Sequence, residues 1–215
     1  MSTPRLHLPR VVTSEDESLA TSALRAYFFS QEFTGGQWDG FDPSGTRAQS
    51  SNVFTADDAL STALLDTELS GRAVSRLLVT PQHDFGALLS AVGPDRDFVE
   101  VDPDPAGDDM RPVYALYEAL KDLPDVGYTR ASKLLARKRP RLFAIIDSKV
   151  LETVFRETET DTYVGRSLLH ASLAADDHRL WERLAGFHRA AELPEDVSVL
   201  RVFDVLAWME ATGRL

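Results

Sequence analysis

The sequence predicts an all-α protein, folded as an orthogonal helical bundle. Leucine, alanine and valine recur along most of the chain at the spacing of about 3.6 residues that places them on one face of a helix. Several of these apolar runs begin directly after a residue that caps helices well. No stretch of useful length alternates polar and apolar residues as a half-buried strand would.

Capping residues define four helices in the first half of the chain. Ser14 and Thr55 are each followed three residues later by an acid, which is the spacing of a capping box. Ser70 and Pro81 stand where two further helices would begin. The four predicted helices span residues 14–31, 55–67, 70–78 and 81–92.

Three segments of this half are predicted to be irregular. Residues 1–13 form an arm that lies on the domain. Residues 33–52 are rich in glycine, and so long a loop is usually functional or disordered. We favour a surface loop anchored in the core by Trp38 over a lid or substrate wall. Residues 93–109 are rich in Asp and Pro but lack the order of a calcium loop, so we favour a solvated connector over a cation site.

Helical spacing continues through the second half of the chain. The predicted helices span residues 110–122, 128–138, 148–157, 162–174, 177–191 and 198–212. A short extended piece is possible at 142–146, and Trp181 and Trp208 are expected in the core. We predict one domain over 1–215, comprising N-terminal helices and loops at 14–109, a helix-hairpin-helix module at 110–157 and C-terminal helices at 158–215.

Composition narrows the classes of function. The formal charge of −11 argues against indiscriminate binding of nucleic acid or anionic membranes. There is no cysteine, so disulfides and thiolate sites are absent, and this fits a cytoplasmic location. No apolar run approaches the roughly 18 residues of a membrane span. The five histidines show no metal-ligand spacing, and we expect neither a metal nor a cofactor.

The most informative stretch is a turn between two predicted helices. Leu123-Pro124-Asp125-Val126-Gly127 has turn chemistry, and helical spacing restarts after it. A turn that opens a helix presents backbone N–H groups to which a phosphate can bind. The segment 128–146 contains six Arg and Lys and no acid. We therefore favour contact with phosphates over a surface whose cations balance the helix dipole and pair with acids. The expected contacts with the DNA backbone are Val126, Gly127, Thr129, Arg130, Lys133, Arg137, Lys138 and Arg139.

This stretch resembles the helix-hairpin-helix superfamily of DNA glycosylases. In that superfamily the hairpin reads L-P-x-V-G or L-P-G-I-G, and a catalytic aspartate follows its last glycine by about twenty residues. Asp147 follows Gly127 by twenty positions here. The resemblance covers roughly 30 of 215 residues. The chain also resembles an uncharacterised family of actinobacterial proteins with this module, which implies no activity.

The resemblance implies that Asp147 stabilises positive charge on a sugar while a flipped base departs. From the residues alone Asp147 is also a good helix N-cap, and both roles are compatible. Thr129 stands where bifunctional members keep a Schiff-base lysine, so a lyase step is not expected, and the iron–sulfur cluster of some members is excluded by the lack of cysteine. Asp125 replaces the first glycine of the hairpin, and its carboxylate would repel a phosphate.

Three functions follow from these patterns. The first is a DNA-binding protein that resembles a monofunctional base-excision glycosylase and hydrolyses an N-glycosidic bond with Asp147. The second is a non-catalytic helix-hairpin-helix module that binds the DNA backbone or a partner protein. In the third, the hairpin is purely structural.

Overall fold

The computed structural model describes residues 4–157 and 162–215, and within these ranges the protein is all-helical with no strand. The predicted all-α class is therefore confirmed. The predicted arm and the predicted C-terminal segment each include residues, 1–3 and 158–161, that lie outside the described ranges. The α-helices are α1 (Arg10–Thr13), α2 (Ser18–Phe29), α3 (Ala56–Ser61), α4 (Gly71–Val74), α5 (Phe85–Val92), α6 (Met110–Lys121), α7 (Tyr128–Lys138), α8 (Ser148–Thr153), α9 (Thr162–Ala190) and α10 (Val199–Ala211).

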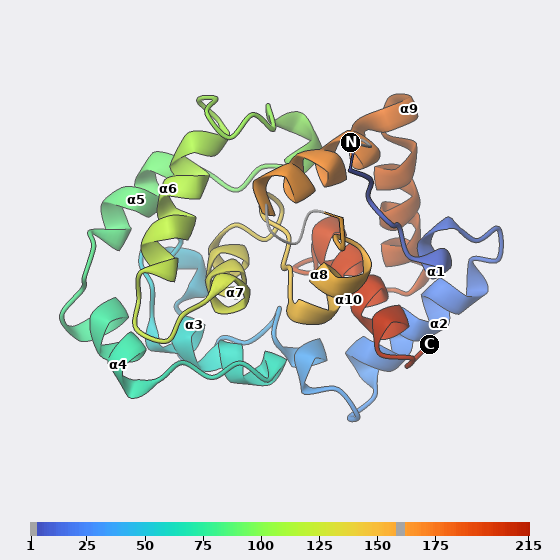
Figure 1. Ribbon diagram of the computed structural model, residues 1–215. Helices are drawn as coiled ribbons and strands as arrows, with labels where there is room; N and C mark the ends of the chain where they lie inside the picture. The colour runs from blue at the N-terminus through green and yellow to red at the C-terminus, as the bar shows by residue number, and fades with distance from the viewer. Residues whose placement is uncertain (1–3, 158–161) are drawn as a thin grey trace.

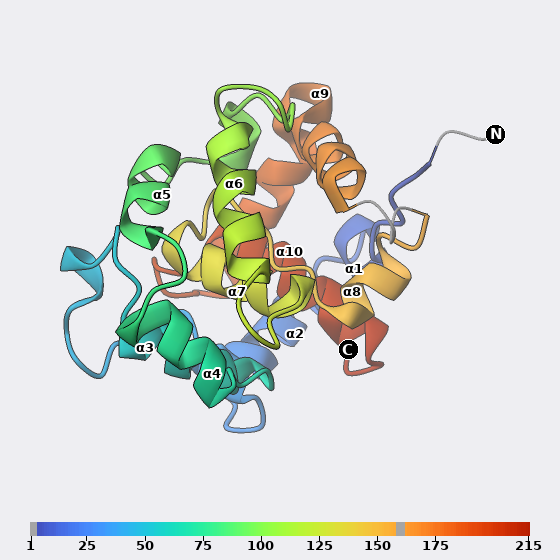
Figure 2. The ribbon, with the colours of Figure 1, turned by 60° about the vertical axis from the view of Figure 1, so that its left-hand side comes forward.

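Helix α7 lies in the middle of the molecule. Figure 1 shows it close to end-on, with α5 and α6 on one side and α8 and α10 on the other. After a turn of 60° it still lies between α6 and α10 (Figure 2). The segments 131–136 and 142–146, before and after the end of this helix, are buried throughout. Helix α7 is thus packed on most of its sides, so most of its charged side chains must find partners inside the protein.

Several predicted helix starts are confirmed by their caps. The Thr55 hydroxyl accepts a hydrogen bond from the Asp58 N–H at 3.3 Å, and the Asp58 carboxylate accepts one from the Thr55 N–H at 2.8 Å. Ser70 caps α4, and the Ser198 hydroxyl accepts a hydrogen bond from the Arg201 N–H at 3.1 Å at the start of α10. These side chains satisfy N–H groups that a helix leaves unpaired at its first turn.

Two predicted starts are wrong, and in both cases a nearby aspartate replaces the predicted residue. Helix α2 begins four residues after Ser14, where the Asp16 carboxylate accepts the Ser18 N–H at 2.9 Å. Helix α5 begins after Asp84 rather than at Pro81, because the Asp84 carboxylate accepts the Ala87 N–H at 2.9 Å. The predicted helix at 148–157 ends at Thr153, and the N-terminal arm contains the short α1.

The predicted break between two C-terminal helices is present inside α9. Residues Ala175 to His178 leave helical geometry, with positive φ at 176–178. The acidic connector is less solvated than predicted. It contains a short 3-10 turn, Phe98–Glu100, whose Phe98 and Val99 are buried, and Asp97 pairs with Arg141 at 2.7 Å.

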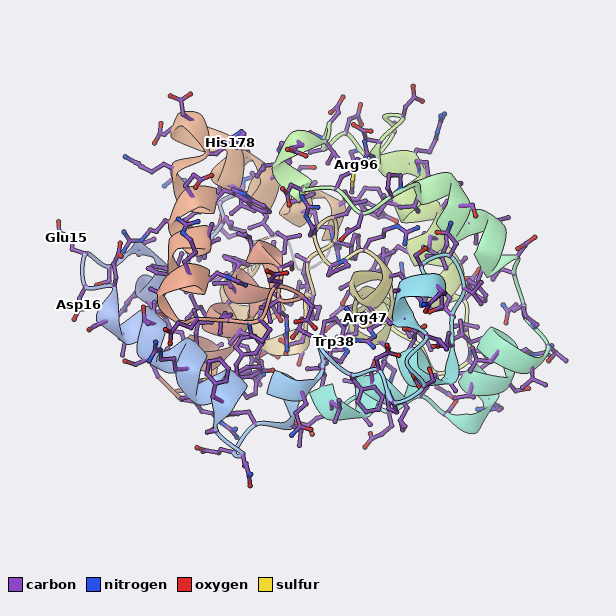
Figure 3. All side chains as sticks on the ribbon, turned by 180° about the vertical axis from the view of Figure 1, so that it is seen from behind. Glu15, Asp16, Trp38, Arg47, Arg96 and His178 are labelled. Carbon is purple, nitrogen blue, oxygen red and sulfur yellow. The ribbon has the colours of Figure 1, made fainter. Side chains whose placement is uncertain are left out.

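Trp38 anchors the loop at 33–52, as predicted. It is 1% exposed and packs with Ala136 of α7 and with Ile145 in a small apolar cluster beside the main core. Figure 3 shows Trp38 and Arg47 close together near the middle of the molecule, seen from behind. The loop does more than cover the surface, because its first residues also line a cavity.

Candidate functional site

Asp147 stands where a buried segment meets a helix. The five residues before it, 142–146, are all buried, and α8 begins directly after it. One carboxylate oxygen, Oδ1, accepts a hydrogen bond from the Val150 N–H at 2.9 Å. The predicted N-cap role is therefore confirmed. The side chain is half-buried rather than enclosed, so capping leaves part of the carboxylate accessible.

A cavity of about 450 Å³ opens beside Asp147. It is bounded by the first residues of the 33–52 loop, by residues 64–67, by α7 and by α10. Its size lies within the range of about 300–1,000 Å³ that is usual for pockets that bind small molecules. Thr129, the residue at the lysine position of the resemblance, lines the same cavity.

Lys133 lies one helical turn beyond Thr129 on the same face of α7. Its side chain is buried, and Nζ donates a hydrogen bond to the Leu65 carbonyl at 2.9 Å. Burial lowers the pKa of Lys133 to about 8, although the negative charges of Asp147 and Asp204 act in the opposite direction. Lys133 therefore faces the cavity as a counter-charge to its carboxylates. Its contact with a DNA phosphate stays a prediction, because Lys133 lines the cavity and the Leu65 carbonyl takes one of its three donors.

Helix α10 adds a second carboxyl group to the cavity. Asp204 is buried, and it accepts a hydrogen bond from Nη1 of Arg201. Burial raises the pKa of Asp204 to about 7; the charge of Arg201 lowers it, and the charge of Asp147 raises it further. Beside the exposed Glu32 and Asp66, the cavity thus contains two carboxyl groups in different surroundings: Asp147 at a helix N-terminus and Asp204 in the interior.

Aromatic rings form another part of the wall. Tyr27 and Phe33 are stacked with their centroids 5.3 Å apart, and Trp208 meets Phe33 edge-on at 6.1 Å. The guanidinium of Arg214 lies 5.2 Å from the centroid of the Trp208 ring. Arg214 also lies 5.5 Å from the centroid of Phe33, so a flat heterocycle would stack on these rings only in place of that guanidinium. The predicted core position of Trp208 is only partly met, since it is half-buried at the cavity.

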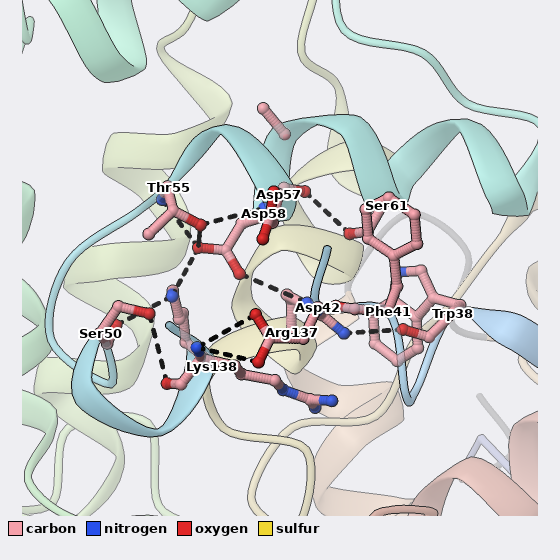
Figure 4. A network of polar contacts seen from close by, with 12 residues as sticks. Trp38, Phe41, Asp42, Ser50, Thr55, Asp57, Asp58, Ser61, Arg137 and Lys138 are labelled. Carbon is pink, nitrogen blue, oxygen red and sulfur yellow. Dashed lines mark hydrogen bonds and ion pairs between the residues drawn. The ribbon is translucent and has the colours of Figure 1, made fainter. Parts of the chain in front are cut away.

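The basic residues at the C-terminal end of α7, 137–139, lie in the interior and not on the surface. They hold neighbouring segments together, and we call them the clamp. Arg137 and Lys138 both pair with Asp58, at 3.3 and 2.5 Å, and all three side chains are buried (Figure 4). Arg137 also donates to the Trp38 carbonyl at 2.7 Å, and Lys138 donates to the Ser50 carbonyl at 2.9 Å. These contacts fasten the 33–52 loop to α3 and α7.

Arg139 continues this clamp. It is 2% exposed and donates to the carbonyls of Gly93, Ser51 and Leu89 at 2.7–2.9 Å. The predicted phosphate contacts at Arg137, Lys138 and Arg139 are therefore wrong in this structure. Their donors bind backbone carbonyls, Asp58 and the Asn52 side chain. Arg137 and Lys138 border a cavity of about 880 Å³, but all three residues are at most 7% exposed.

The hairpin before α7 remains at the surface. Asp125 takes the left-handed conformation with φ of 63°, which explains why a glycine suits this position. Its carboxylate pairs with Arg72 at 3.2 Å, and Arg130 donates to the Asp125 carbonyl at 3.1 Å. Gly127 is exposed, and no described residue lies within 4 Å of the position that a Cβ would take there.

Not every predicted hairpin contact is available to a phosphate. The Val126 N–H donates to the Leu123 carbonyl at 3.1 Å and the Val126 side chain is buried, so its predicted role as a phosphate donor is wrong here. Gly127 and Thr129 stand at the first turn of α7, which has no side-chain cap. Arg130 is half-buried, and its Nε donates a hydrogen bond to the Glu68 carbonyl at 3.0 Å.

The sequence interpretation overlooked the contribution of α10. Arg201 and Asp204 lie three residues apart on a helix whose neighbouring positions are almost all apolar, and that contrast was a usable signal. A charge on a buried helix face requires a partner, so such a pair marks an internal polar site. Tyr27 carried no comparable signal, because its spacing in α2 equals that of ordinary core residues.

Asp204 predicts a pH dependence of stability. The pKa of a carboxyl group raised from 3.8 to about 7 means that the folded state holds a proton which the unfolded state releases. The stabilising contribution is full below pH 4 and is lost as the pH rises through 7. We expect Asp204→Asn to flatten this decline, with an upper limit of about 4 kcal/mol at 1.36 kcal/mol per pKa unit.

Urea unfolding at several pH values between 4 and 8, for wild type and variant, measures the difference. Asp95 has a pKa raised to about 6 by burial and contributes a decline of the same sign to both proteins. The contribution of Asp95 to the pH slope is therefore the same in wild type and variant and cancels in the comparison. Equal pH slopes for the two proteins would contradict the assignment to Asp204.

Within residues 4–157 and 162–215, none of the helices combines the length and the apolar character needed to cross a membrane. Comparison with curated proteins and with solved structures yields no match. The likeness to the glycosylase superfamily thus stays a resemblance carried by residues 123–147. A family described as a "Family of unknown function (DUF6308)" matches residues 20–211, most of the chain. The chain therefore belongs to the DUF6308 family.

Proposed function

We propose that this protein hydrolyses an N-glycosidic bond in DNA, as a monofunctional glycosylase with Asp147 as its catalytic carboxylate. The observation that carries the proposal is the cavity of about 450 Å³ beside Asp147. A carboxylate that served only as a helix cap would require no such space. Residue spacing alone suggested Asp147, and the cavity supports a role for it beyond capping.

The chemistry suits the surroundings of this carboxylate. As the base departs, positive charge develops at C1′ of the sugar, and a fixed negative charge nearby stabilises it. Asp147 is held in place by the Val150 N–H, while Lys133 behind it supplies the compensating positive charge. A lysine with a pKa of about 8 still carries most of its charge at pH 7, so a positive charge stays at the cavity beside the two carboxyl groups.

The cavity wall supports a flat substrate group. Phe33 and Trp208 line the cavity beneath the Arg214 guanidinium, which a base could replace, and Thr129 supplies a hydroxyl at the α7 side. A base rotated out of the helical stack would meet both kinds of contact. Thr129 cannot form a Schiff base, so the product strand is expected to keep an intact abasic site.

The DNA contact we propose is smaller than the predicted basic surface. It consists of the exposed turn at Gly127, the first turn of α7 with Thr129, and the exposed cations Lys149 and Arg214 at the cavity. Because few charges take part and Asp125 adds a negative one, we propose weak, salt-sensitive binding. A cytoplasmic location also stays a prediction.

Asp125→Gly is expected to strengthen this binding several-fold. The change removes a like charge from the approach of a phosphate, and glycine adopts the observed positive φ without strain. The lost ion pair with Arg72 is exposed and worth little. Fluorescence anisotropy with a labelled duplex at two salt concentrations measures the effect. Glu68→Gln, a change of equal charge on a nearby exposed residue, is the control; an equal gain there would show a general charge effect.

The test of the proposed function is release of free base. Wild type and Asp147→Asn are incubated with DNAs that carry damaged, mismatched or phage-type modified bases, and released bases are identified by mass spectrometry. We expect wild type to release a base from at least one substrate and the variant to release it about 10²–10³-fold more slowly. Borohydride should trap no covalent adduct.

A different result selects the alternative function. If wild type binds DNA but releases nothing across the panel, the protein is a non-catalytic module that binds DNA. If it neither binds DNA nor releases a base, the proposed function is wrong, and the turn at Gly127 is structural or contacts a protein.

A further inference from the structure

Arg201 sits between two buried carboxyl groups. Its Nε lies 3.1 Å from Oδ2 of Asp39, and its Nη1 donates to Asp204. The remaining nitrogen, Nη2, donates to the Tyr27 hydroxyl at 2.9 Å and to the Gly35 carbonyl at 3.1 Å. Each of its three nitrogens thus has a partner. One positive charge serves two carboxyl groups in the interior.

Two buried carboxyl groups share the charge of Arg201, because Asp39 and Asp204 both pair with it. Lys133 and Asp147 also act on Asp204, and Arg47 and Arg137 also act on Asp39. Removal from water disfavours the charged form of a carboxyl group, so this buried pair retains a proton to higher pH than a solvated carboxyl group does. The other charged groups at the cavity, Glu32, Asp66, Lys149 and Arg214, are exposed and solvated.

Of the two carboxyl groups on Arg201, Asp204 is among the described residues that line the cavity and Asp39 is not. Burial raises the pKa of both groups, for Asp204 to about 7. A proton held at Asp204 can reach a bound molecule, whereas one held at Asp39 is enclosed. Asp147 caps α8 in the same cavity and is half-buried.

We propose that Asp204 is the general acid that protonates the departing base, which makes it a second catalytic residue beside Asp147. This inference rests on the proposed function. The C1′–N bond breaks with both electrons going to the base nitrogen, which takes the proton of Asp204. Water then bonds to C1′, and the proton that it loses returns to the Asp204 carboxylate. The substrate class is therefore a base that leaves poorly unless it is protonated.

The pH profile of base release tests the assignment. Wild type, under single-turnover conditions on its best substrate, is expected to lose activity as the pH rises above about 7, where Asp204 ionises. Asp204→Asn keeps the shape and the hydrogen bond to Arg201 but has no proton to transfer. We expect its rate at pH 6 to fall about 100-fold and its profile to be flat between pH 6 and 8.

Two further variants separate proton transfer from structure. Asp39→Asn leaves Asp204 as the sole acid on Arg201, which lowers the pKa of Asp204, so the alkaline decline should move to lower pH. Asp95→Asn removes a carboxyl group that also titrates near neutrality but lies away from this cavity, so the profile should not change. A purely structural role of Asp204 would move none of these profiles.

Infrared difference spectroscopy keeps the test independent of whether Asp204→Asn folds. Wild type should show a protonated-carboxyl band at pH 6 that disappears with the midpoint of the kinetic decline and persists in Asp95→Asn. If wild type releases base with no such band or no alkaline decline, Asp204 is not the acid, while the proposed function stands. If wild type releases no base, the proposed function and this inference fail together.

Discussion

Asp147→Asn is expected to lower the rate of base release by about 10²–10³-fold while leaving the fold and the DNA affinity nearly unchanged. The loss corresponds to about 2.7–4 kcal/mol of transition-state stabilisation, the usual cost of removing one electrostatic group aimed at a developing charge. The fold should tolerate the change because asparagine caps helices about as well as aspartate. Its amide oxygen can accept the Val150 N–H as Oδ1 does now.

Asp147→Ala supplies the matched control for capping. It removes both the charge and the cap, so it should lose base release to the same degree and also about 1 kcal/mol of stability. Single-turnover base release and urea unfolding of the three proteins separate the two roles. Full activity in Asp147→Asn would leave Asp147 as a cap and nothing more.

Arg137→Ala is expected to destabilise the fold by about 3–5 kcal/mol, because the buried carbonyls of Trp38 and Phe41 lose their donor and Asp58 keeps only Lys138 as its ionic partner. Its side chain is 1% exposed, it pairs with Asp58, and it donates to the carbonyls of Trp38, Asp39 and Phe41. Domains of ordinary stability unfold at only 5–15 kcal/mol, so the variant loses a large share of the total.

Arg141→Ala is the control for this variant. Arg141 is 49% exposed and pairs with Asp97 at 2.7 Å, and an exposed ion pair of this kind contributes about 0.2–1 kcal/mol. Chemical unfolding of both variants gives the comparison. Similar losses would show that Arg137 is solvated and that the 33–52 loop does not depend on it.

The burial of Arg137 and Lys138 also changes how DNA binding can be probed. Reversing both charges would place two carboxylates beside Asp58 in the interior, and the protein would unfold. A loss of DNA binding would then report on folding. Lys149 and Arg214 are exposed at the cavity, so their substitution tests the contact without that difficulty.

Periodicity and capping chemistry predicted most of the helices because both are local. Thr55, Ser70, Asp147 and Ser198 each cap the helix that their sequence context indicated. The starts predicted at Ser14 and Pro81 are wrong because Asp16 and Asp84, two and three residues later, accept the N–H groups of Ser18 and Ala87. Sequence alone does not show which of several neighbouring start signals is used, since that depends on where the chain enters the core.

The candidate site was predictable only in part. The spacing from Gly127 identified Asp147, and the structure adds a cavity beside it. The charge run in α7 was misinterpreted because the acceptors of Arg137, Lys138 and Arg139 are backbone carbonyls of distant loops. Every residue type has a backbone carbonyl, so no pattern of residue types in the sequence indicates which carbonyls will accept from these cations. A run of cations therefore does not distinguish a surface from an interior.

The same clamp has a consequence for the order of folding. The carbonyl that Arg137 binds at Trp38 lies 99 residues away along the chain, and the Ser50 carbonyl on Lys138 lies 88 away. Closing loops of that length carries an entropic cost before any contact forms, and these cations give up their water only when all of their acceptors are assembled. Helix α7 can form early from its own spacing, but its charged end is desolvated late. The 33–52 loop is then among the last segments to reach its native place, and the unfolding rate, more than the folding rate, depends on the strength of its clamp.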